Sequence, residues 1–82
     1  MSKWNLYIIK CRDGSLYTGI TTDLAKRLKC HNEGKASKYT RARKPVKIVH
    51  KEFFDNESAA RKREIKVKGL SRAEKIELVK NG

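Results

Sequence analysis

The chain opens with two short apolar runs separated by a polar turn. Residues 4–11 (WNLYIIKC) and 15–20 (SLYTGI) are rich in β-branched and aromatic side chains, which is typical of strands. Between them stands Asp13-Gly14, the strongest short-range signal for a hairpin. The pattern therefore predicts that the chain begins with a β-hairpin.

A helical pattern follows the hairpin. Either Thr22 or Asp23 can cap a helix that extends to about Glu33, because both side chains accept hydrogen bonds from the free amides of a first turn. Leu24 and Leu28 lie one turn apart and form its buried stripe. We therefore expect this helix to pack on the hairpin.

The middle of the chain predicts a loop, a strand and a second helix. Residues 34–44 (GKASKYTRARK) begin with a glycine that suits a helix end and continue with many cations, so we expect an exposed basic loop. Pro45 then introduces an alternating apolar stretch, residues 46–54, which predicts a third strand. Asn56 can cap a second helix that runs to about Lys68.

The end of the chain predicts a third helix. Gly69 ends the second helix, and Ser71 and Glu74 have the spacing of a capping box. The apolar side of this helix consists of Ala73, Ile76 and Val79. The order ββαβαα predicts an α+β fold, a small three-stranded antiparallel sheet flanked by helices. With 82 residues there is no room for a second core, so we expect a single domain over 1–82.

Charge adds the first functional information. The 21 Lys and Arg residues against 9 Asp and Glu give a net charge of +12, which favours polyanions, and nucleic acid is the commonest of these. A membrane surface would require a basic amphipathic helix with bulky anchors, and no predicted helix contains Trp or Phe. Cys11 and Cys30 lack metal-site spacing and suit reduced thiols. The N-terminus has no apolar leader and the chain has no long apolar run, so we expect a cytoplasmic protein. We also expect a monomer.

The basic loop is the natural candidate for contact with nucleic acid. Its cations are Lys35, Lys38, Arg41, Arg43 and Lys44. They could follow a phosphate backbone while the ring of Tyr39 stacks on a base. The alternative is a merely solvated charged loop. The excess positive charge of the chain favours binding, although it bears on binding only and not on catalysis.

Glu64 is the most informative single residue. On the predicted second helix it projects beside Ala60 and Val67, on the side that should face the sheet. A carboxylate there needs a partner, either an arginine in a structural role or a metal ion. Mg²⁺ is commonly held by one or two carboxylates together with waters and substrate phosphate oxygens, so a single glutamate is sufficient.

Several other residues become informative only in combination. Arg27 and His31 lie one turn apart beside the leucine stripe of the first helix, where either could be merely solvated or structural. Tyr7 and Tyr17 are strand aromatics, whose usual role is packing. Gly19 within a strand suggests a bulge or a close approach of the backbone to a ligand.

Taken in order, these positions resemble the motif set of the GIY-YIG nuclease superfamily. The motifs are Asn5-Leu6-Tyr7, Tyr17-Thr18-Gly19, Arg27, His31 and Glu64. The resemblance extends over residues 4–70 and is greatest to the short, standalone bacterial members. The first motif has Asn-Leu-Tyr where the family name has Gly-Ile-Tyr, and Thr18 stands where Ile is usual.

The resemblance implies an active site and a cofactor. Its residues are Tyr7, Tyr17, Arg27, His31 and Glu64. By this resemblance Glu64 holds one divalent cation, Mg²⁺ or Mn²⁺, and Arg27 stabilises charge on the phosphoryl oxygens. Tyr7, in preference to Tyr17, accepts a proton from the attacking water. A phenol with its ordinary pKa near ~10 is a poor base at neutral pH, so this role requires a lowered pKa.

The two tyrosines also impose a condition on the hairpin. With a strict two-residue turn at Asp13-Gly14, Tyr7 pairs with Ile20, and Tyr7 and Tyr17 lie on opposite faces of the sheet. A bulge or a three-residue loop restores a common face. We therefore predict that the turn is irregular.

The sequence as a whole predicts a metal-dependent endonuclease that hydrolyses phosphodiester bonds. We expect DNA rather than RNA as its substrate, with recognition of structure rather than base sequence and a role in DNA repair or processing. The alternative is a catalytically silent nucleic-acid-binding module with the same fold, which the charge alone would support.

Overall fold

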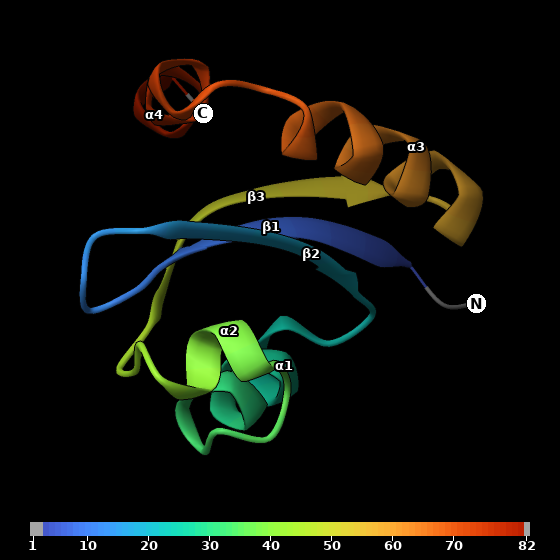
Figure 1. Ribbon diagram of the computed structural model, residues 1–82. Coiled ribbons are helices and arrows are strands. Elements are labelled where there is room, and N and C mark those ends of the chain that lie inside the picture. The colour runs from blue at the N-terminus through green and yellow to red at the C-terminus, as the bar shows by residue number, and fades with distance from the viewer. Residues whose placement is uncertain (1–2, 82) are drawn as a thin grey trace.

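A three-stranded antiparallel sheet forms the centre of the protein (Figure 1). The computed structural model describes residues 3–81, so the expected domain limits at residues 1 and 82 lie outside the described residues. The strands are β1 (Trp4–Lys10), β2 (Leu16–Thr21) and β3 (Lys47–Phe54), in the spatial order β2-β1-β3. The first strand is therefore central, and β2 forms one edge of the sheet.

Helices cover both faces of this sheet. One face carries α1 (Leu24–Asn32) and the short α2 (Lys38–Arg41), and the other carries α3 (Glu57–Lys68) and α4 (Arg72–Asn81), as Figure 1 shows. The α+β class and the flanking helices are confirmed. The predicted element order lacked α2, because the segment that contains it was interpreted as an exposed loop. No helix within residues 3–81 is long and apolar enough to cross a membrane.

The predicted helix caps explain where the helices begin. Asp23 accepts a hydrogen bond from the amide of Lys26 at 3.0 Å and caps α1, so the choice between Thr22 and Asp23 falls on Asp23. Asn56 caps α3 through the amide of Ala59 at 2.8 Å. The capping box of α4 is also confirmed, because Ser71 and Glu74 each accept a hydrogen bond from the other's backbone amide, at 3.2 and 2.9 Å.

The hairpin has the predicted irregularity. The amide of Cys11 donates to the carbonyl of Ser15 at 2.9 Å, which leaves three residues in the loop, and Gly14 has φ +85°. This geometry corresponds to a three-residue hairpin with glycine in the left-handed conformation. As a result Tyr7 pairs with Gly19, and Tyr17 pairs with Ile9. Both tyrosines therefore lie on the same face of the sheet.

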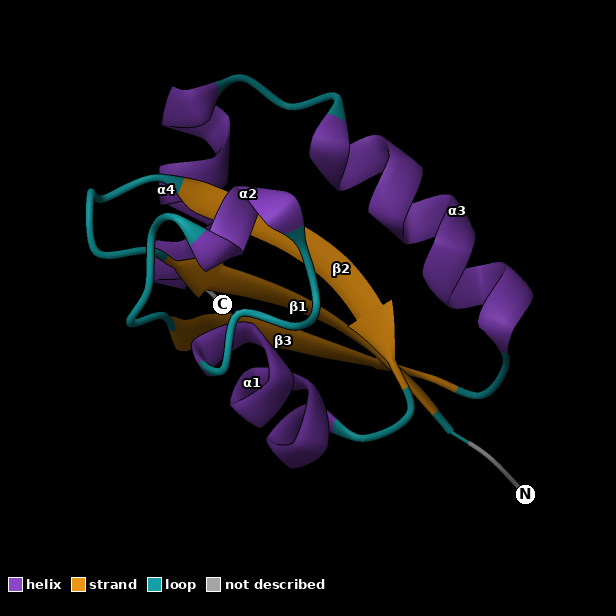
Figure 2. Cartoon of the chain, turned by 60° about the horizontal axis from the view of Figure 1, so that its bottom comes forward, coloured by secondary structure: helices purple, strands orange, loops and turns teal. Residues whose placement is uncertain are grey.

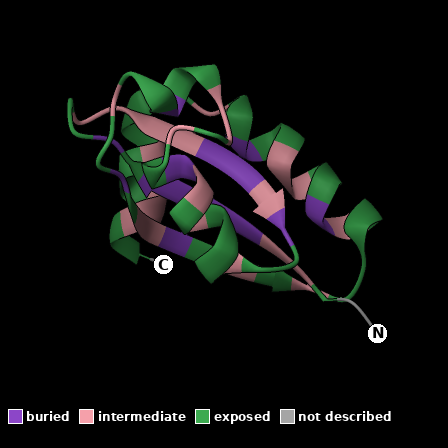
Figure 3. Cartoon of the chain, turned by 90° about the horizontal axis from the view of Figure 1, so that it is seen from below, coloured by how far each residue is buried: buried purple, intermediate pink, exposed green. Residues whose placement is uncertain are grey.

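Two apolar clusters fill the spaces between the layers. On the α1 side, Tyr7, Ile9, Cys11 and Val46 are buried, and the predicted stripe of Leu24 and Leu28 packs against them. On the α3 side the buried residues are Leu6, Ile8 and Val67. Figure 3 shows that burial is concentrated in the strands, whereas the outward sides of the helices are exposed.

The apolar side of α4 differs from the prediction. Val79 packs on the core as expected, but its partner there is Leu78. Ala73 and Ile76 are exposed. The two ends of the helix make different contacts, because Leu78 and Val79 pack on the core, whereas at its start Arg72 donates to the carbonyl of Gly14 at 3.1 Å.

A charged network joins β3 to α3. Arg63 donates to both carboxylate oxygens of Glu52, at 2.9 and 3.1 Å, and His50 lies 2.8 Å from the same carboxylate. Burial raises the pKa of Glu52, but the hydrogen bonds from Arg63 and His50 outweigh it and lower that pKa overall. This network fixes α3, which carries Glu64, against the sheet.

Candidate active site

Tyr7 lies across the edge strand of the sheet. A Cβ atom built on Gly19 would lie within 2.6 Å of the Tyr7 ring atom Cζ. The ring therefore crosses from β1 over Gly19 toward the β2 edge. The sequence suggested a bulge or an approaching ligand at Gly19, but the pairing there is regular and the approaching group is the ring of Tyr7. A glycine is required because any side chain would occupy the same space.

The hydroxyl group of Tyr7 is hydrogen-bonded to the imidazole of His31. The distance from Tyr7 Oη to His31 Nε2 is 3.0 Å, and the imidazole is 1% exposed. Tyr17 contacts the same imidazole edge-on, with ring centroids 5.4 Å apart. The shared face of the hairpin thus brings both tyrosines onto one histidine, which α1 positions from below the sheet.

The electrostatic environment favours the neutral forms of both groups. Burial raises the pKa of Tyr7 to about 12, and the guanidinium of Arg27 only partly opposes this. The pKa of His31 is lowered by burial and by the positive charge of Arg27. The mechanism predicted from the sequence requires a lowered pKa for Tyr7. In the protein without metal or substrate this pKa is raised instead, because desolvation outweighs the charge of Arg27.

Arg27 lies at the rim of the site and is exposed. It forms no salt bridge with any carboxylate of residues 3–81. It borders a cleft of about 460 Å³ whose lining includes Lys26 and Lys35. The lining contains these three cations and one acidic residue, Asp23, and Lys35 also lies 3.8 Å from Glu33. The excess of positive charge is a suitable environment for a phosphate group.

Glu64 approaches the site from the opposite face of the sheet. Figure 2 shows α3 running beside β2, and the Glu64 side chain on this helix is 15% exposed. Ala60 and Val67 beside it are fully buried, as predicted. The carboxylate is near enough to Tyr7 for its charge to raise the pKa of the phenol. The position of Glu64 on the side of the helix that faces the sheet agrees with the sequence-based interpretation.

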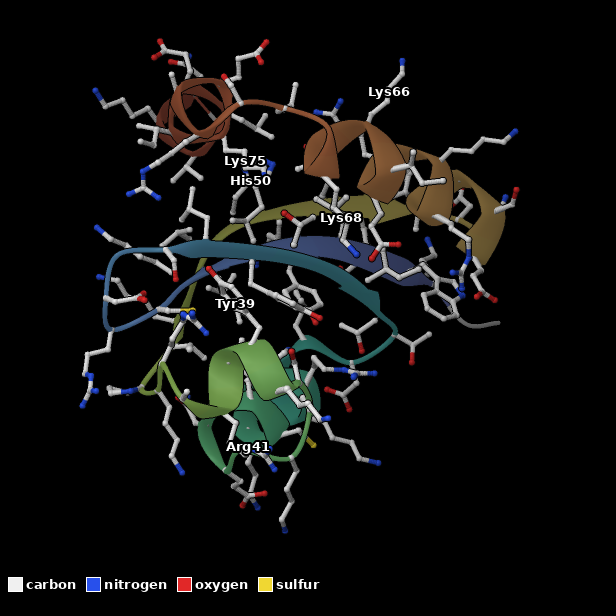
Figure 4. All side chains as sticks on the ribbon, viewed as in Figure 1. Tyr39, Arg41, His50, Lys66, Lys68 and Lys75 are labelled. Carbon is white, nitrogen blue, oxygen red and sulfur yellow. The ribbon has the colours of Figure 1, made fainter. Side chains whose placement is uncertain are left out.

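The partner of Glu64 is a lysine rather than the arginine considered from the sequence. Lys68 Nζ lies 3.1 Å from Glu64 Oε2, one turn along α3. In Figure 4 Lys68 points toward the sheet, whereas Lys66 on the same helix points away from it. The lysine supplies a positive charge at the position where a metal ion bound to Glu64 would supply one.

The donor set fits a divalent cation that is completed by substrate. Residues 3–81 hold no group of three or more His, Cys, Asp or Glu side chains that could bind a metal together. Glu64 is nevertheless a mostly buried carboxylate whose charge reaches Tyr7, and one of its oxygens is paired with the partly exposed Lys68. Mg²⁺ commonly takes one or two carboxylates and fills its other positions with water and phosphate oxygens, so this single ligand is compatible with it.

The fold and this geometry agree with comparison to known proteins. A family model described as the GIY-YIG catalytic domain matches residues 3–77. The chain belongs to the GIY-YIG family. The matched range extends over the segment from Tyr7 to Glu64.

Similar proteins occur in bacteria and archaea. A UPF0213 protein of Staphylococcus saprophyticus is 49% identical over 82 residues, with 100% of both chains covered. A UPF0213 protein of Clostridium perfringens is 53% identical over 74 residues, which cover 90% of this chain and 80% of that protein. A UPF0213 protein of the archaeon Haloquadratum walsbyi is 49% identical over 77 residues, covering 94% and 86%.

Two solved structures share the fold. The solution NMR structure of a UPF0213 protein from Bacillus halodurans has a TM-score of 0.62 and 45% identity, covering 95% of this chain and 83% of that one. The solution NMR structure of a protein from E. faecalis has a TM-score of 0.67 and 40% identity, covering 99% and 86%.

The basic segment contributes less uniformly than its composition suggested. Arg43 donates to Asp13 at 3.1 Å and to the carbonyl of Tyr39 at 2.9 Å, so it fastens α2 to the hairpin turn. The ring of Tyr39 is stacked on Tyr17 and also lies under the Arg43 guanidinium, at 4.1 Å. Arg41 points away from the sheet in Figure 4. The exposed cations of the segment are Lys35, Lys38, Arg41 and Lys44.

Sequence reasoning missed one buried member of this site, Thr40. Its hydroxyl lies 2.8 Å from His31 Nδ1, and the residue is 0% exposed. The segment was interpreted as an exposed loop because of its charges, although Ser37 followed by three residues of moderate helix propensity is compatible with a capped turn. Ser37 does cap α2, by accepting a hydrogen bond from the Tyr39 amide at 3.1 Å.

Proposed function

We propose that this protein is a divalent-metal-dependent endonuclease that hydrolyses phosphodiester bonds in DNA. The observation that supports this most directly is the hydrogen bond between Tyr7 and His31, formed beside Arg27 and within reach of the charge of Glu64. This arrangement combines a proton acceptor, a cation for the phosphate and a carboxylate for a metal at one edge of the sheet. These are the groups that phosphodiester hydrolysis requires.

The proton leaves the attacking water through Tyr7 and His31. Because the pKa of Tyr7 is raised to about 12, the phenol is neutral before reaction and can accept a proton only while it gives up its own. Its hydroxyl lies 3.0 Å from His31 Nε2, so the water proton passes to Tyr7 Oη as the Tyr7 proton passes to the imidazole. As the water oxygen forms the new bond to phosphorus, the bond from phosphorus to the departing oxygen breaks, and that oxygen takes a proton from solvent while His31 ends as imidazolium.

Charge on the phosphate is balanced from both faces of the sheet. Arg27 stabilises the negative charge that develops on the phosphoryl oxygens, since no carboxylate of residues 3–81 holds it in a salt bridge. When bound, a divalent cation with Glu64 as its protein ligand supplies polarisation of the scissile phosphate and stabilisation of the departing oxygen. Tyr17 packs on His31 and holds the imidazole beneath Tyr7.

The substrate is DNA recognised by its structure, in repair or processing. The net charge of +12 provides affinity for any phosphate backbone. The rim of the site offers exposed lysines and Arg27 and little surface for reading base edges. Cleavage of a panel of flaps, forks, gaps and duplexes of varied sequence tests this point, and a single preferred base sequence across plain duplexes contradicts it.

A catalytically silent nucleic-acid-binding module is the second candidate function. It is favoured by the Lys68 to Glu64 salt bridge, which satisfies the carboxylate without a metal. Both candidate functions predict binding that weakens with salt, so binding assays do not separate them. Cleavage does.

The decisive experiment incubates wild-type protein with plasmid and branched oligonucleotides in Mg²⁺ or Mn²⁺, beside Glu64→Gln and Glu57→Gln. Glu57 lies in the first turn of α3 and pairs with Arg61, so Glu57→Gln makes the same chemical change on the same helix outside the site. We expect cleavage by wild type and Glu57→Gln and none by Glu64→Gln. Equal cleavage by all three points to a different site, and cleavage by none supports the binding module.

A further inference from the structure

A chain of buried hydrogen bonds runs from the active-site tyrosine into α2. His31 contacts Tyr7 through Nε2 at 3.0 Å and Thr40 through Nδ1 at 2.8 Å. The Thr40 hydroxyl contacts the carbonyl of Ser37 at 3.3 Å. His31 is 1% exposed and Thr40 is 0% exposed, so water does not compete for these partners.

The donor and acceptor of each hydrogen bond in this chain depend on its last member, the contact between the Thr40 hydroxyl and the Ser37 carbonyl. A backbone carbonyl can only accept, so the 3.3 Å contact of the Thr40 hydroxyl with Ser37 is a hydrogen bond only when the hydroxyl directs its single proton there. Toward His31 the same oxygen must then accept, which places the ring proton on Nδ1. In the neutral imidazole Nε2 is left without a proton, and it accepts from the Tyr7 hydroxyl.

We propose that Thr40 is a positioning residue that holds His31 in the Nδ1–H tautomer, so that Nε2 stays free to take the proton of Tyr7. The opposite tautomer would donate to Tyr7 and could not accept from it, although the ring would occupy the same place. This inference rests on the proposed function for its catalytic consequence. The tautomer itself is a property of the folded protein and can be measured without any cleavage.

The fold around α2 is built for this contact. Ser37 caps the helix with its side chain and accepts from Thr40 with its carbonyl. Arg43 fastens the far end of the same segment to Asp13 in the hairpin turn. A four-residue helix has little stability of its own, so these anchors hold Thr40 against the imidazole. The segment therefore serves the active site through its one buried side chain.

The first test is the tautomer of His31 in wild-type protein, read from the ring ¹⁵N shifts of ¹⁵N-histidine-labelled protein above the pKa of the ring. His50 is assigned separately by His50→Gln. We expect His31 to have a protonated Nδ1 and a bare Nε2. A ring proton on Nε2, or an even mixture, overturns the proposal whether or not the protein cleaves DNA.

The second test removes the hydroxyl with little change of shape. Thr40→Val should shift His31 toward the Nε2–H tautomer, and Thr40→Ser, which keeps the hydroxyl, should retain the wild-type shifts. The matched control is Thr18→Val, because Thr18 is a buried strand threonine, 4% exposed, whose hydroxyl has no hydrogen-bond partner within residues 3–81. Unchanged His31 shifts in a folded Thr40→Val protein overturn the proposal.

Catalysis supplies the third readout. On the order of a 10- to 100-fold fall in kcat is expected for Thr40→Val, with KM for DNA nearly unchanged, because orienting partners of a functional histidine have effects of this size. Thr40→Ser should restore most of the rate, and Thr18→Val should match wild type. A Thr40→Val protein with wild-type kcat overturns the catalytic part of the proposal. An inactive wild type with the expected tautomer would refute the proposed function and leave the tautomer assignment confirmed.

Discussion

Tyr7 occupies the space that a side chain on Gly19 would fill. The two residues are direct partners across β1 and β2, and a Cβ on Gly19 would lie within 2.6 Å of Tyr7 Cζ. The phenol reaches His31 only because β2 has a glycine at this position. The edge strand thus contributes to the site by the absence of a side chain.

Gly19→Ala should therefore displace the phenol and break its hydrogen bond to His31. We expect loss of cleavage and a fall of about 1–3 kcal/mol in the free energy of unfolding, as for other overpacked cores. Gly69→Ala is the control, since a Cβ there meets nothing closer than 3.5 Å. Urea unfolding and initial rates of cleavage measure both effects, and an active Gly19→Ala protein would contradict this account of Tyr7.

The rate of cleavage should depend on pH through His31. The imidazole must be neutral to accept the Tyr7 proton, and burial and Arg27 lower its pKa below the usual 6.5. The rate at saturating metal should rise through a pKa below that value and stay level above neutrality. Single-turnover rates over a pH series measure this. A rate that keeps rising well above neutrality would instead indicate a Tyr7 phenolate as the base.

His31 should also make stability depend on pH in a defined direction. Its folded-state pKa lies below the unfolded value near 6.5, so the unfolded chain binds the extra proton first. Its contribution to stability is complete above about pH 6.5 and is lost as the pH falls through the folded-state pKa. Urea unfolding of wild type and His31→Gln at several pH values checks this, and the variant should show the flatter profile.

Lys68 should compete with the metal for Glu64. Its ammonium lies 3.1 Å from the carboxylate, and the pair must separate or open when a cation binds. Lys68→Met should raise Mn²⁺ affinity by about 2- to 5-fold, the size expected for a partly exposed ion pair. Lys66→Met removes the same charge from a side chain that points away (Figure 4). Calorimetric titration with Mn²⁺ compares them, and equal affinities in the two variants would exclude competition.

The network behind α3 should matter for stability. Glu52 accepts two hydrogen bonds from Arg63, and His50 Nε2 lies 2.8 Å from the same carboxylate. Glu52→Ala leaves the partly buried guanidinium without its acceptor, so we expect a loss of about 1–3 kcal/mol. Glu52→Gln keeps the shape and part of the bonding and should lose less. Because the pKa of Glu52 is lowered, the wild-type advantage should disappear as the pH falls below about 4.5.

The sequence was sufficient for features that depend on local chemistry. The caps at Asp23 and Asn56 and the box at Ser71 follow from side chains that satisfy nearby amides, and all three are present. The irregular turn was also predictable, because the condition that Tyr7 and Tyr17 share a face excludes a strict two-residue turn.

Features that depend on tertiary burial were not predictable in this way. Thr40 lies in a run of exposed cations, and nothing in its neighbours along the chain shows that its side chain is buried against His31. The direction of the Tyr7 pKa also depends on how far the ring is desolvated, which overrides the positive charge visible in the sequence. The pairing of Lys68 with Glu64 was not predictable either, because the sequence was compatible with an arginine or a metal ion as the partner of Glu64.

The candidate site draws its groups from two layers that meet only at the edge of the sheet. Tyr7, His31 and Arg27 belong to the side covered by α1, and Glu64 comes from α3 on the other side. Loss of the carboxylate would leave the proton route, the basic surface and the core intact. The proposed nuclease and the silent binding module are therefore separated by one carboxylate, that of Glu64, and a substitution at this single position would convert one into the other without disturbing the fold.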